Sequence, residues 1–298
     1  MLRSPSTAVR SMSQQVDELT PRLLRDWRLP EPHGSKYDRG SVLVVGGSAK
    51  TPGAAQLSGL AALRVGAGHL SLAVAGSAAV SLAVATPEAG VIGLPENDRG
   101  SVIAGHLDEL DEELTSADAV LVGPGLDDAK ETRRLIEQLV PKLGPRVWLV
   151  LDAYALGPLP DLIEAIAPVR GRLVLTPNES EGARLLGREV RSEREVAAIA
   201  ARYSAVVTCQ GIISDPDGRC WRFSAGDVGL ATSGSGDVLA GTVAGLVARS
   251  GDGAQATCWA TYLHAAAGER LASRVGRLGF LAREILDELP AVMVELDS

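Results

Sequence analysis

One loop of the sequence combines residues that are suited to phosphate chemistry. Gly234, Ser235 and Gly236 directly precede Asp237, within the run ATSGSGDVLAGTVAGLVA at 231–248. The first amides of a helix have no partner inside the helix, and glycines let a phosphate approach them closely. A carboxylate in such an anion site would be repelled by phosphate unless it accepts the proton of an attacking hydroxyl. Asp237 is therefore predicted to be a catalytic base, although acidic residues are also common in the first turn of ordinary helices.

Four other loops follow strand-like segments and carry glycine, proline or acidic residues. These loops are GGSAKTPGAA at 46–55, VGPGLD at 122–127, LDAYAL at 151–156 and TPNESE at 176–181. Glycine at the end of a strand lets a ligand approach the backbone, but it also serves a tight turn. Asp152 either caps the turn that follows it or is an acid linked to a metal, and the cap is favoured. Asn178 and Glu181 have the spacing of a capping box, which is the simplest explanation of that pair.

Alternating strand-like and helical segments must position these loops. Short apolar runs predict strands at 41–45, 69–74, 119–122, 147–151, 172–175, 205–208 and 220–223. Helical patterns lie at 54–65, 131–140, 179–186, 193–203, 237–249 and 254–272. Such alternation predicts an α/β protein with a mostly parallel central sheet and helices on both faces, in three αβα layers. The loops at the carboxyl ends of the strands would then meet at one edge, where such sheets bind ligands.

Composition and charge narrow the class of protein. No internal repeat or long linker is visible, so we predict a single catalytic domain over 36–298 after a flexible or partly ordered lead over 1–35. The net charge of −8 and the lack of a basic stripe argue against a nucleic-acid partner. The uncharged run at 70–87 is interrupted by serines, and we interpret it as a strand leading into a helix rather than a membrane span.

The cysteines and histidines do not form a recognisable metal site. Cys209, Cys220 and Cys258 lack the spacing of a zinc site or a disulfide framework. We interpret them as buried thiols in a reducing compartment, the cytoplasm. The four histidines have no partner at metal-ligand spacing, and His264, among alanines of a helix expected to be buried, is given little weight.

The loop at 231–241 resembles the Gly-x-Gly-Asp motif of the ribokinase-like superfamily. The order of the other motifs is similar to that of the ADP-dependent NAD(P)H-hydrate dehydratases within it. The similar motifs are GGS at 46–48, GAA at 53–55, AALRVGAG at 61–68, PE at 87–88, GPG at 123–125, Asp152 with Leu156, and TPN at 176–178 with Glu181. They run in order from about residue 36 to residue 290, so the resemblance implies a ribokinase-like fold.

This resemblance also implies an activity and a set of site residues. The activity is that of a lyase that dehydrates (6S)-NAD(P)H hydrate to NAD(P)H, with Mg²⁺ and with ADP, or ATP, as co-substrate. Asp237 would be the catalytic residue, and the residues that bind the hydrate would be Ala54, Gly123, Gly125, Asn178 and Asp237. The adenine nucleotide would contact Gln210, Gly211, Ile212, Ile213, Ser214, Gly234, Ser235 and Gly236. No residue is assigned to the metal, and a homo-oligomer, expected to be a tetramer, is implied.

Three positions depart from the pattern of that family. Asn178 stands where the family usually has His, Gln210 where Lys usually precedes Gly, and Asp127 where the loop commonly ends in Gly. Losing one cation and gaining one anion is expected to weaken nucleotide binding, by about 1 to 3 kcal/mol for a partly buried contact. Two alternatives stay open. A small-molecule kinase of the same superfamily would share the anion site, and a degenerate paralogue that binds a nucleotide without catalysis is favoured by Asn178 and Gln210.

Overall fold

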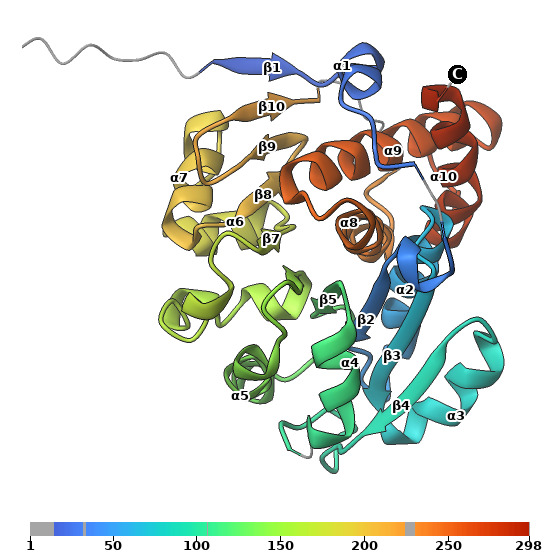
Figure 1. Ribbon diagram of the computed structural model, residues 1–298, viewed down its shortest axis with the longest axis vertical. Helices are drawn as coiled ribbons and strands as arrows, with labels where there is room; N and C mark the ends of the chain where they lie inside the picture. The colour runs from blue at the N-terminus through green and yellow to red at the C-terminus, as the bar shows by residue number, and fades with distance from the viewer. Residues whose placement is uncertain (1–14, 32–33, 106, 224–229, 298) are drawn as a thin grey trace, which may run out of the picture.

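A ten-stranded sheet forms the centre of the molecule (Figure 1). The computed structural model describes residues 15–31, 34–105, 107–223 and 230–297. The strands lie in the order β1-β10-β9-β8-β7-β6-β5-β2-β3-β4, and all neighbours are parallel except the pairs that β9 makes with β8 and β10. Their bounds are β1 Val16–Glu18, β2 Ser41–Val45, β3 His69–Ala75, β4 Gly90–Leu94, β5 Ala119–Val122, β6 Trp148–Leu151, β7 Leu173–Leu175, β8 Val206–Cys209, β9 Ile212–Ser214 and β10 Cys220–Arg222.

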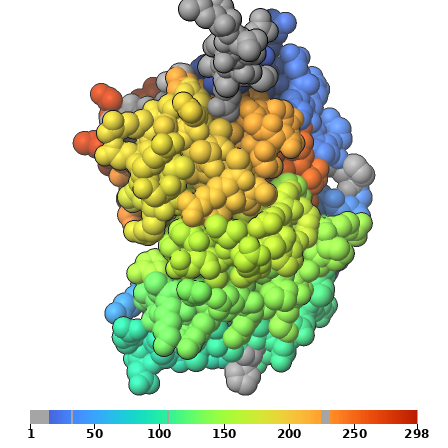
Figure 2. Space-filling view, turned by 90° about the vertical axis from the view of Figure 1, so that its left-hand side faces the viewer, coloured from blue at the N-terminus to red at the C-terminus, as the bar shows by residue number. Residues whose placement is uncertain are grey.

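Helices cover both faces of the sheet, because its strands are apolar on both sides. Val42 and Val44 of β2 belong to the core under α2, α8, α9 and α10, whereas Leu43 and Val45 belong to the opposite core. Figure 2 shows the side of the molecule that lies at the left of Figure 1, where segments coloured from green through yellow to orange succeed one another in chain order. The bounds are α1 Pro21–Asp26, α2 Pro52–Arg64, α3 Gly76–Ala85, α4 Asp111–Ser116, α5 Ala129–Leu139, α6 Glu179–Leu186, α7 Glu193–Tyr203, α8 Ser235–Ser250, α9 Gly253–Arg274 and α10 Ala282–Asp297. The predicted mostly parallel three-layer architecture is confirmed.

The elements predicted from the sequence are all present, and others were missed. Every predicted strand forms with bounds within one residue, and every predicted helix with bounds within two. The uncharged run at 70–87 forms β3 and α3, as expected, and none of the helices in the described ranges is long and apolar enough to cross a membrane. The three cysteine thiols are buried, as expected. The elements missed are β1, β4, β9, α1, α4 and α10.

Part of the N-terminal lead packs onto the domain. β1 pairs in parallel with β10, and Leu24 of α1 is fully buried. Two side chains of α9 hold the segment that follows α1, since the indole Nε1 of Trp259 donates to the carbonyl of Trp27 at 2.9 Å and the amide of Gln255 donates to that of Arg28 at 2.9 Å. The division of the chain at residue 36 stays a prediction.

Helices α2 and α8 lie in close contact because small residues line their interface. A Cβ atom on Gly241 would lie 2.0 Å from the carbonyl oxygen of Ser58, and one on Gly245 would lie 2.7 Å from the Cα of Ala62. Larger side chains at these positions would force the helices apart. The loops that lead into the two helices are therefore held at a fixed distance from each other.

Candidate active site

The loops after β2 and β5 are joined at the point where the strand order reverses. β2 lies between β3 and β5. The chain continues from β2 to β3 and β4 on one side, and it then crosses to β5 on the other side of β2. The amides of Gly47 and Ser48 donate to the carbonyls of Pro124 and Gly125, each at 2.8 Å, and the Thr51 hydroxyl donates to Gly125 at 2.8 Å. Open α/β sheets bind ligands at such a reversal. The two loops thus form one wall of a candidate site.

Packing explains both glycines of the loop after β5. Gly123 has φ 127°, and a Cβ there would lie 1.9 Å from the carbonyl oxygen of Asp152. Gly125 has φ 73°, and a Cβ there would lie 2.4 Å from the carbonyl oxygen of Thr51. The NH of Gly123 also donates to Val45, at 3.1 Å. Contact of these glycines with a hydrate stays a prediction, since the loop geometry alone requires them.

The start of α2 offers room for a ligand. Ala54 is half-buried, and the preceding Gly53 is exposed, with no atom within 4 Å of the place a Cβ would occupy. The hydroxyl of Ser58, one turn further on, donates to the carbonyls of Ala54 and Asp237 at 3.0 and 2.9 Å. The first turn of α2 is therefore tied to the first turn of α8.

Two amides at the amino end of α8 have no hydrogen-bond acceptor among the described residues. The amide of Ser235 donates to Thr232 at 3.2 Å, and that of Val238 donates to Gly234 at 3.1 Å. In the described part of the chain, the amides of Gly236 and Asp237 have no hydrogen-bond acceptor. A Cβ on Gly236 would meet nothing within 4 Å, so the space beside this residue is open. The donors that remain for the predicted anion site are the amides of Gly236 and Asp237, at the positive end of a 16-residue helix.

Asp237 lies in this first turn with its carboxyl group half-buried. Its burial raises the pKa of the carboxyl group to about 6. A general base works best when its pKa is near the working pH, because it is then both deprotonated and able to hold a proton. The side chain is suited to accept a proton from a ligand at the start of α8.

Asp152, at the end of β6, is a buried acid at the N-cap position of the 3₁₀ helix Ala153–Leu156. Its side chain makes no capping hydrogen bond, so the predicted capping role of the side chain was wrong, and the backbone amide of Ala153 offsets only a small part of the effect of burial on the carboxyl group. Instead its Oδ1 accepts a hydrogen bond from the hydroxyl of Thr176 at 2.7 Å. Burial, with smaller effects from the negative charges of Asp237 and Glu181, raises the pKa of Asp152 to about 8. Three carboxyl groups, from the end of β6 and the first turns of α6 and α8, therefore gather at this edge of the sheet.

Asn178 and Glu181 form the capping box that their spacing predicted. The amide of Glu181 donates to Oδ1 of Asn178 at 3.0 Å, and the amide of Asn178 donates to Oε2 of Glu181 at 2.9 Å. The side-chain nitrogen of Asn178 has no acceptor among the described residues. Asn178 is exposed and lines a cavity, so the cap leaves its amide hydrogens available to a ligand.

That cavity has a volume of about 640 Å³, within the usual range for small-molecule sites. It is bounded by the loop after β7, the turn from β8 to β9, the start of α8 and the middle of α9. Gln210 and Gly211 form the turn with φ 52° and 76°, the backbone of a two-residue hairpin. The lining residues are Thr176, Pro177, Asn178, Glu179, Thr208, Gln210, Gly211, Phe223, Leu230, Ala231, Gly236, Leu239, Thr261, His264 and Ala265.

The predicted nucleotide residues fall into two groups. Gln210, Gly211 and Gly236 line the cavity. Ile213 and Ser214 are fully buried in β9, and the hydroxyl of Ser214 donates to the carbonyl of Arg219 at 3.1 Å. Direct contact of Ile212, Ile213 and Ser214 with a nucleotide stays a prediction.

His264, to which the sequence interpretation gave little weight, lines the cavity. Its Nε2 lies 2.9 Å from the hydroxyl and 3.0 Å from the carbonyl oxygen of Ser235, the first residue of α8. Burial lowers the pKa of His264 to about 4, so the ring is neutral at pH 7. The two residues are 29 positions apart, and no local spacing could have linked them.

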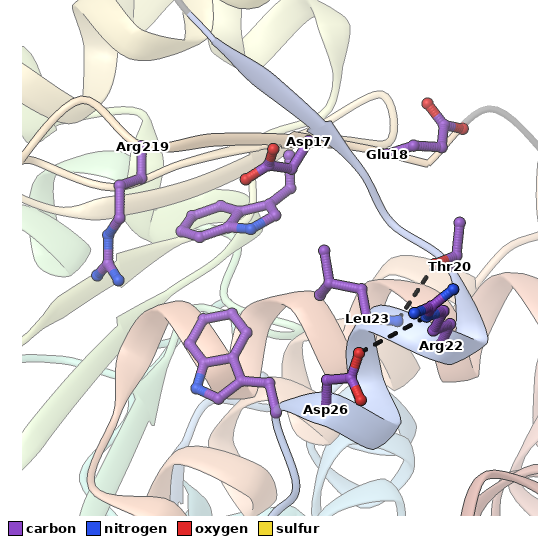
Figure 3. A pocket seen from close by; sticks show the side chains of 9 residues that line it. Asp17, Glu18, Thr20, Arg22, Leu23, Asp26 and Arg219 are labelled. Carbon is purple, nitrogen blue, oxygen red and sulfur yellow. Dashed lines mark hydrogen bonds and ion pairs between the residues drawn. The ribbon is translucent and has the colours of Figure 1, made fainter.

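A second cavity, of about 570 Å³, lies beside α1 at the far edge of the sheet (Figure 3). The rings of Trp27 and Trp221 stack there with centroids 5.6 Å apart, and the guanidinium of Arg219 lies 5.4 Å from the Trp221 ring centre. None of the five loops singled out from the sequence lines this cavity. The candidate active site is therefore the cavity at the ends of the parallel strands.

Comparison with known proteins identifies the family. A family model described as NAD(P)H-hydrate dehydratase matches residues 42–291. The chain belongs to the NAD(P)H-hydrate dehydratase family. An ADP-dependent (S)-NAD(P)H-hydrate dehydratase from Xanthomonas campestris is 43% identical over 95% of this chain and 98% of its own length. A bifunctional NAD(P)H-hydrate repair enzyme from Moorella thermoacetica is 38% identical over 90% of this chain, which spans 52% of that relative.

Solved structures agree with membership of the NAD(P)H-hydrate dehydratase family. The ADP/ATP-dependent NAD(P)H-hydrate dehydratase of Bacillus subtilis, co-crystallised with ATP and Mg²⁺, is 26% identical, with a TM-score of 0.78 over 95% of this chain and 100% of that one. A ribokinase-like superfamily protein from Enterococcus faecalis, 22% identical, has a TM-score of 0.81 over 94% of this chain and 96% of that one. The predicted ribokinase-like fold is confirmed.

The three departures from the pattern of the NAD(P)H-hydrate dehydratases differ in their surroundings. Asn178 and Gln210 both line the larger cavity. Asp127 lies in the loop after β5, and its Oδ1 is buried with no hydrogen-bond partner in the described ranges. An unpaired buried carboxylate oxygen is costly, so this position is the least favourable of the three for stability.

Proposed function

We propose that this protein dehydrates (6S)-NAD(P)H hydrate to NAD(P)H while ADP is cleaved to AMP and phosphate. The observation that carries the proposal is Asp237, whose half-buried carboxyl lies beside the two free amides at the start of α8. Such an arrangement places a proton acceptor next to donors for a phosphoryl group. Membership of the NAD(P)H-hydrate dehydratase family supports the identity of the substrate.

The chemistry follows from these two groups. Asp237 accepts the proton of the hydroxyl on the hydrated ring, and that oxygen attacks the β-phosphorus of ADP as AMP leaves. The amides of Gly236 and Asp237 donate to the oxygens of the phosphoryl group and stabilise their negative charge during its transfer from AMP to the hydrate. The lone pair of the ring nitrogen then expels phosphate, a far better leaving group than hydroxide, and the neighbouring ring carbon loses a proton to solvent. These steps regenerate the nicotinamide ring of NAD(P)H.

The two substrates would lie on either side of Asp237. The hydrate would bind against Ala54 and the loop of Gly123 and Gly125, with the free side-chain amide of Asn178 donating to it. The nucleotide would fill the cavity of about 640 Å³, with Gln210 and Gly211 at its far end and Gly236 at its phosphates. Ile212, Ile213 and Ser214 would hold that turn in place from β9.

The residues present fit a Mg²⁺ ion that arrives with the nucleotide. In the described ranges no group of three or more His, Cys, Asp or Glu side chains is arranged to hold a metal, so a site made by protein alone is not expected. The buried carboxyl of Asp152 and the neighbouring Glu181, whose pKa is also raised by burial, suit a cation that phosphates hold in part. Bound there, Mg²⁺ would neutralise phosphate charge.

We expect a homo-oligomer, a tetramer by family resemblance, in the cytoplasm. The exposed side chains of Val80 and Val84, 77% and 80% accessible and one turn apart on α3, offer an apolar contact for a second copy. Light scattering measures the assembly. Changing both valines to Ser would lower the mass if this face is used.

One assay separates the proposed activity from its alternatives. The protein is incubated with (6S)-hydrated NADH, Mg²⁺ and either ADP or ATP, and the nicotinamide absorbance is followed with time. We expect absorbance to recover together with release of phosphate. A small-molecule kinase would leave the hydrate unchanged, and a degenerate paralogue would bind ADP in calorimetry without any turnover. Either of these results would overturn the proposal.

A further inference from the structure

The hydrogen bonds between His264 and Ser235 fix the state of the imidazole ring. The Nε2 atom lies 2.9 Å from the Ser235 hydroxyl and 3.0 Å from the Ser235 carbonyl oxygen. A carbonyl oxygen only accepts hydrogen bonds, so the contact at 3.0 Å requires a proton on Nε2. With the proton on Nδ1 instead, two lone pairs would face each other. The ring is neutral at pH 7, because its burial lowers the pKa to about 4, and Nδ1 therefore carries no proton.

The contact lies at the start of the helix that carries the candidate base. Ser235 is the first residue of α8, and its own amide donates to the carbonyl of Thr232. Gly236 and Asp237, which follow it, supply the two amides of the anion site. Ser235 and His264 are 3% and 8% accessible, so water cannot easily replace the ring as a donor. The orientation of the first turn of α8 thus depends on a side chain from the middle of α9.

We propose that His264 is a positioning residue, whose Nε2–H holds the carbonyl and hydroxyl oxygens of Ser235 and so orients the amides of Gly236 and Asp237. The proposal rests on the proposed function, because it names a further residue of the same site. His264 does not need to touch the reacting atoms. It acts through Ser235, and its effect is strongest where the amides meet the developing charge of the transferring phosphoryl group.

Two substitutions separate positioning from simple packing. His264→Leu keeps an apolar side chain but removes the donor, whereas the Nε2 amide of His264→Gln can reach the same two oxygens. We expect kcat to fall about 10-fold or more in the Leu variant, with a change in KM for the nucleotide of less than about 3-fold. The Gln variant is expected to recover most of kcat.

Thr257 supplies the matched control on the same helix. It lies seven residues before His264, is fully buried, and its hydroxyl has no hydrogen-bond partner in the described chain. Thr257→Val changes a buried polar group of α9 without touching Ser235, and we expect its kcat to equal that of the wild type. Equal losses of kcat in the Leu and Gln variants would overturn the proposal. A Leu variant with a raised KM for the nucleotide and an unchanged kcat would overturn it as well.

A measurement on the wild-type protein tests the same idea without any turnover. Long-range ¹H–¹⁵N spectra at pH 7 distinguish a ring protonated on Nε2 from one protonated on Nδ1, and Ser235→Ala assigns the signal by shifting it. We expect the Nε2–H form for His264, and the Nδ1–H form would contradict the proposal even if the Leu variant failed to fold. An inactive wild-type protein with the Nε2–H form would count against the proposed function and leave the positioning contact standing.

Discussion

The hydroxyl of Ser58 lies 2.9 Å from the carbonyl oxygen of Asp237 and donates to it. This bond joins the loop after β2, through α2, to the turn that carries the candidate base. Gly241 lets α8 lie against the backbone of Ser58, which brings the two groups within hydrogen-bond distance. The proposed hydrate and phosphate sites are therefore coupled by one buried side chain.

Removing the Ser58 hydroxyl is expected to weaken the contact between α2 and α8. Ser58→Ala should lower the free energy of unfolding by about 0.5 to 1.5 kcal/mol, the usual value of one buried hydrogen bond. Urea denaturation measures this change. Ser77→Ala, which removes an exposed hydroxyl bonded to Glu96, is the control and should cost less. Equal stability of the Ser58 variant and the wild type would show that the bond contributes nothing.

The base assignment predicts a pH dependence of the reaction. Asp237 must be deprotonated to accept a proton, and its pKa is raised to about 6 by burial. We therefore expect kcat/KM to rise with pH through about 6 and to level off above it. Asp237→Asn should lower turnover by about 100-fold or more and leave nucleotide binding nearly unchanged. Asp26→Asn, an exposed change of the same kind on α1, is the control, and an Asp237 variant with most of the wild-type rate would disprove the assignment.

The turn at Gln210 allows a test of the nucleotide site. Gln210→Lys restores the cation that the family usually has. Both residues are non-glycine residues at φ 52°, so the substitution does not change the backbone strain. We expect ADP to bind about 0.5 to 2 kcal/mol more tightly, with the gain shrinking at high salt. Titration calorimetry at two ionic strengths gives the result. Gln210→Met, neutral and of similar length, should show no such gain, and an unchanged affinity in the Lys variant at low salt would place the turn away from the phosphates.

Asn178 has two roles that different substitutions separate. Asn178→Ala removes the cap and should cost about 0.5 to 2 kcal/mol of stability. Asn178→Ser keeps a capping oxygen but loses the side-chain amide, so it should stay closer to wild-type stability while KM for the hydrate rises. Thermal unfolding and steady-state kinetics report the two effects. Wild-type kinetics in both variants would leave Asn178 as a cap only.

The buried acid Asp152 predicts how stability changes with pH. Its pKa is about 8 in the folded state and near 3.8 in the unfolded chain, so between these values the folded state holds a proton that the unfolded chain has released. Stability is therefore lost as pH rises through this window. Relative to the wild type, Asp152→Asn should become more stable by at least about 1 kcal/mol between pH 5 and pH 8.

This comparison is made with EDTA and without nucleotide, so that no cation stabilises the carboxylate. Asp26→Asn again serves as the surface control. A difference in stability between Asp152→Asn and the wild type that does not vary with pH would show that Asp152 ionises normally.

Local patterns predicted the fold well where one segment carries its own signal. The bounds of α6 and α7 agree with the prediction to the residue, because helical periodicity and acidic first turns mark both. β1 and β9 have three residues each and only form by pairing with β10 and β8, so no local pattern revealed them.

The candidate site was predictable only in part for the same reason. Asp237 and the capping box carry their signal within a few residues. The partner of Asp152 is Thr176, 24 residues away, and that of His264 is Ser235, 29 residues away. Those contacts depend on how the strands and helices are placed in three dimensions, and a single sequence does not contain that information in any local spacing.

Helix α9 connects the N-terminal segment to the candidate site. Near one end, Gln255 and Trp259 donate to backbone carbonyls of Arg28 and Trp27, and further along, His264 donates to Ser235. A shortened protein that lacked the segment at 15–31 would leave both of those donors without their backbone acceptors and would uncover this part of α9. Helix α9 would keep its contacts with α8 and α10 but lose those with the N-terminal segment, so an effect on the anion site would have to pass along α9 to His264.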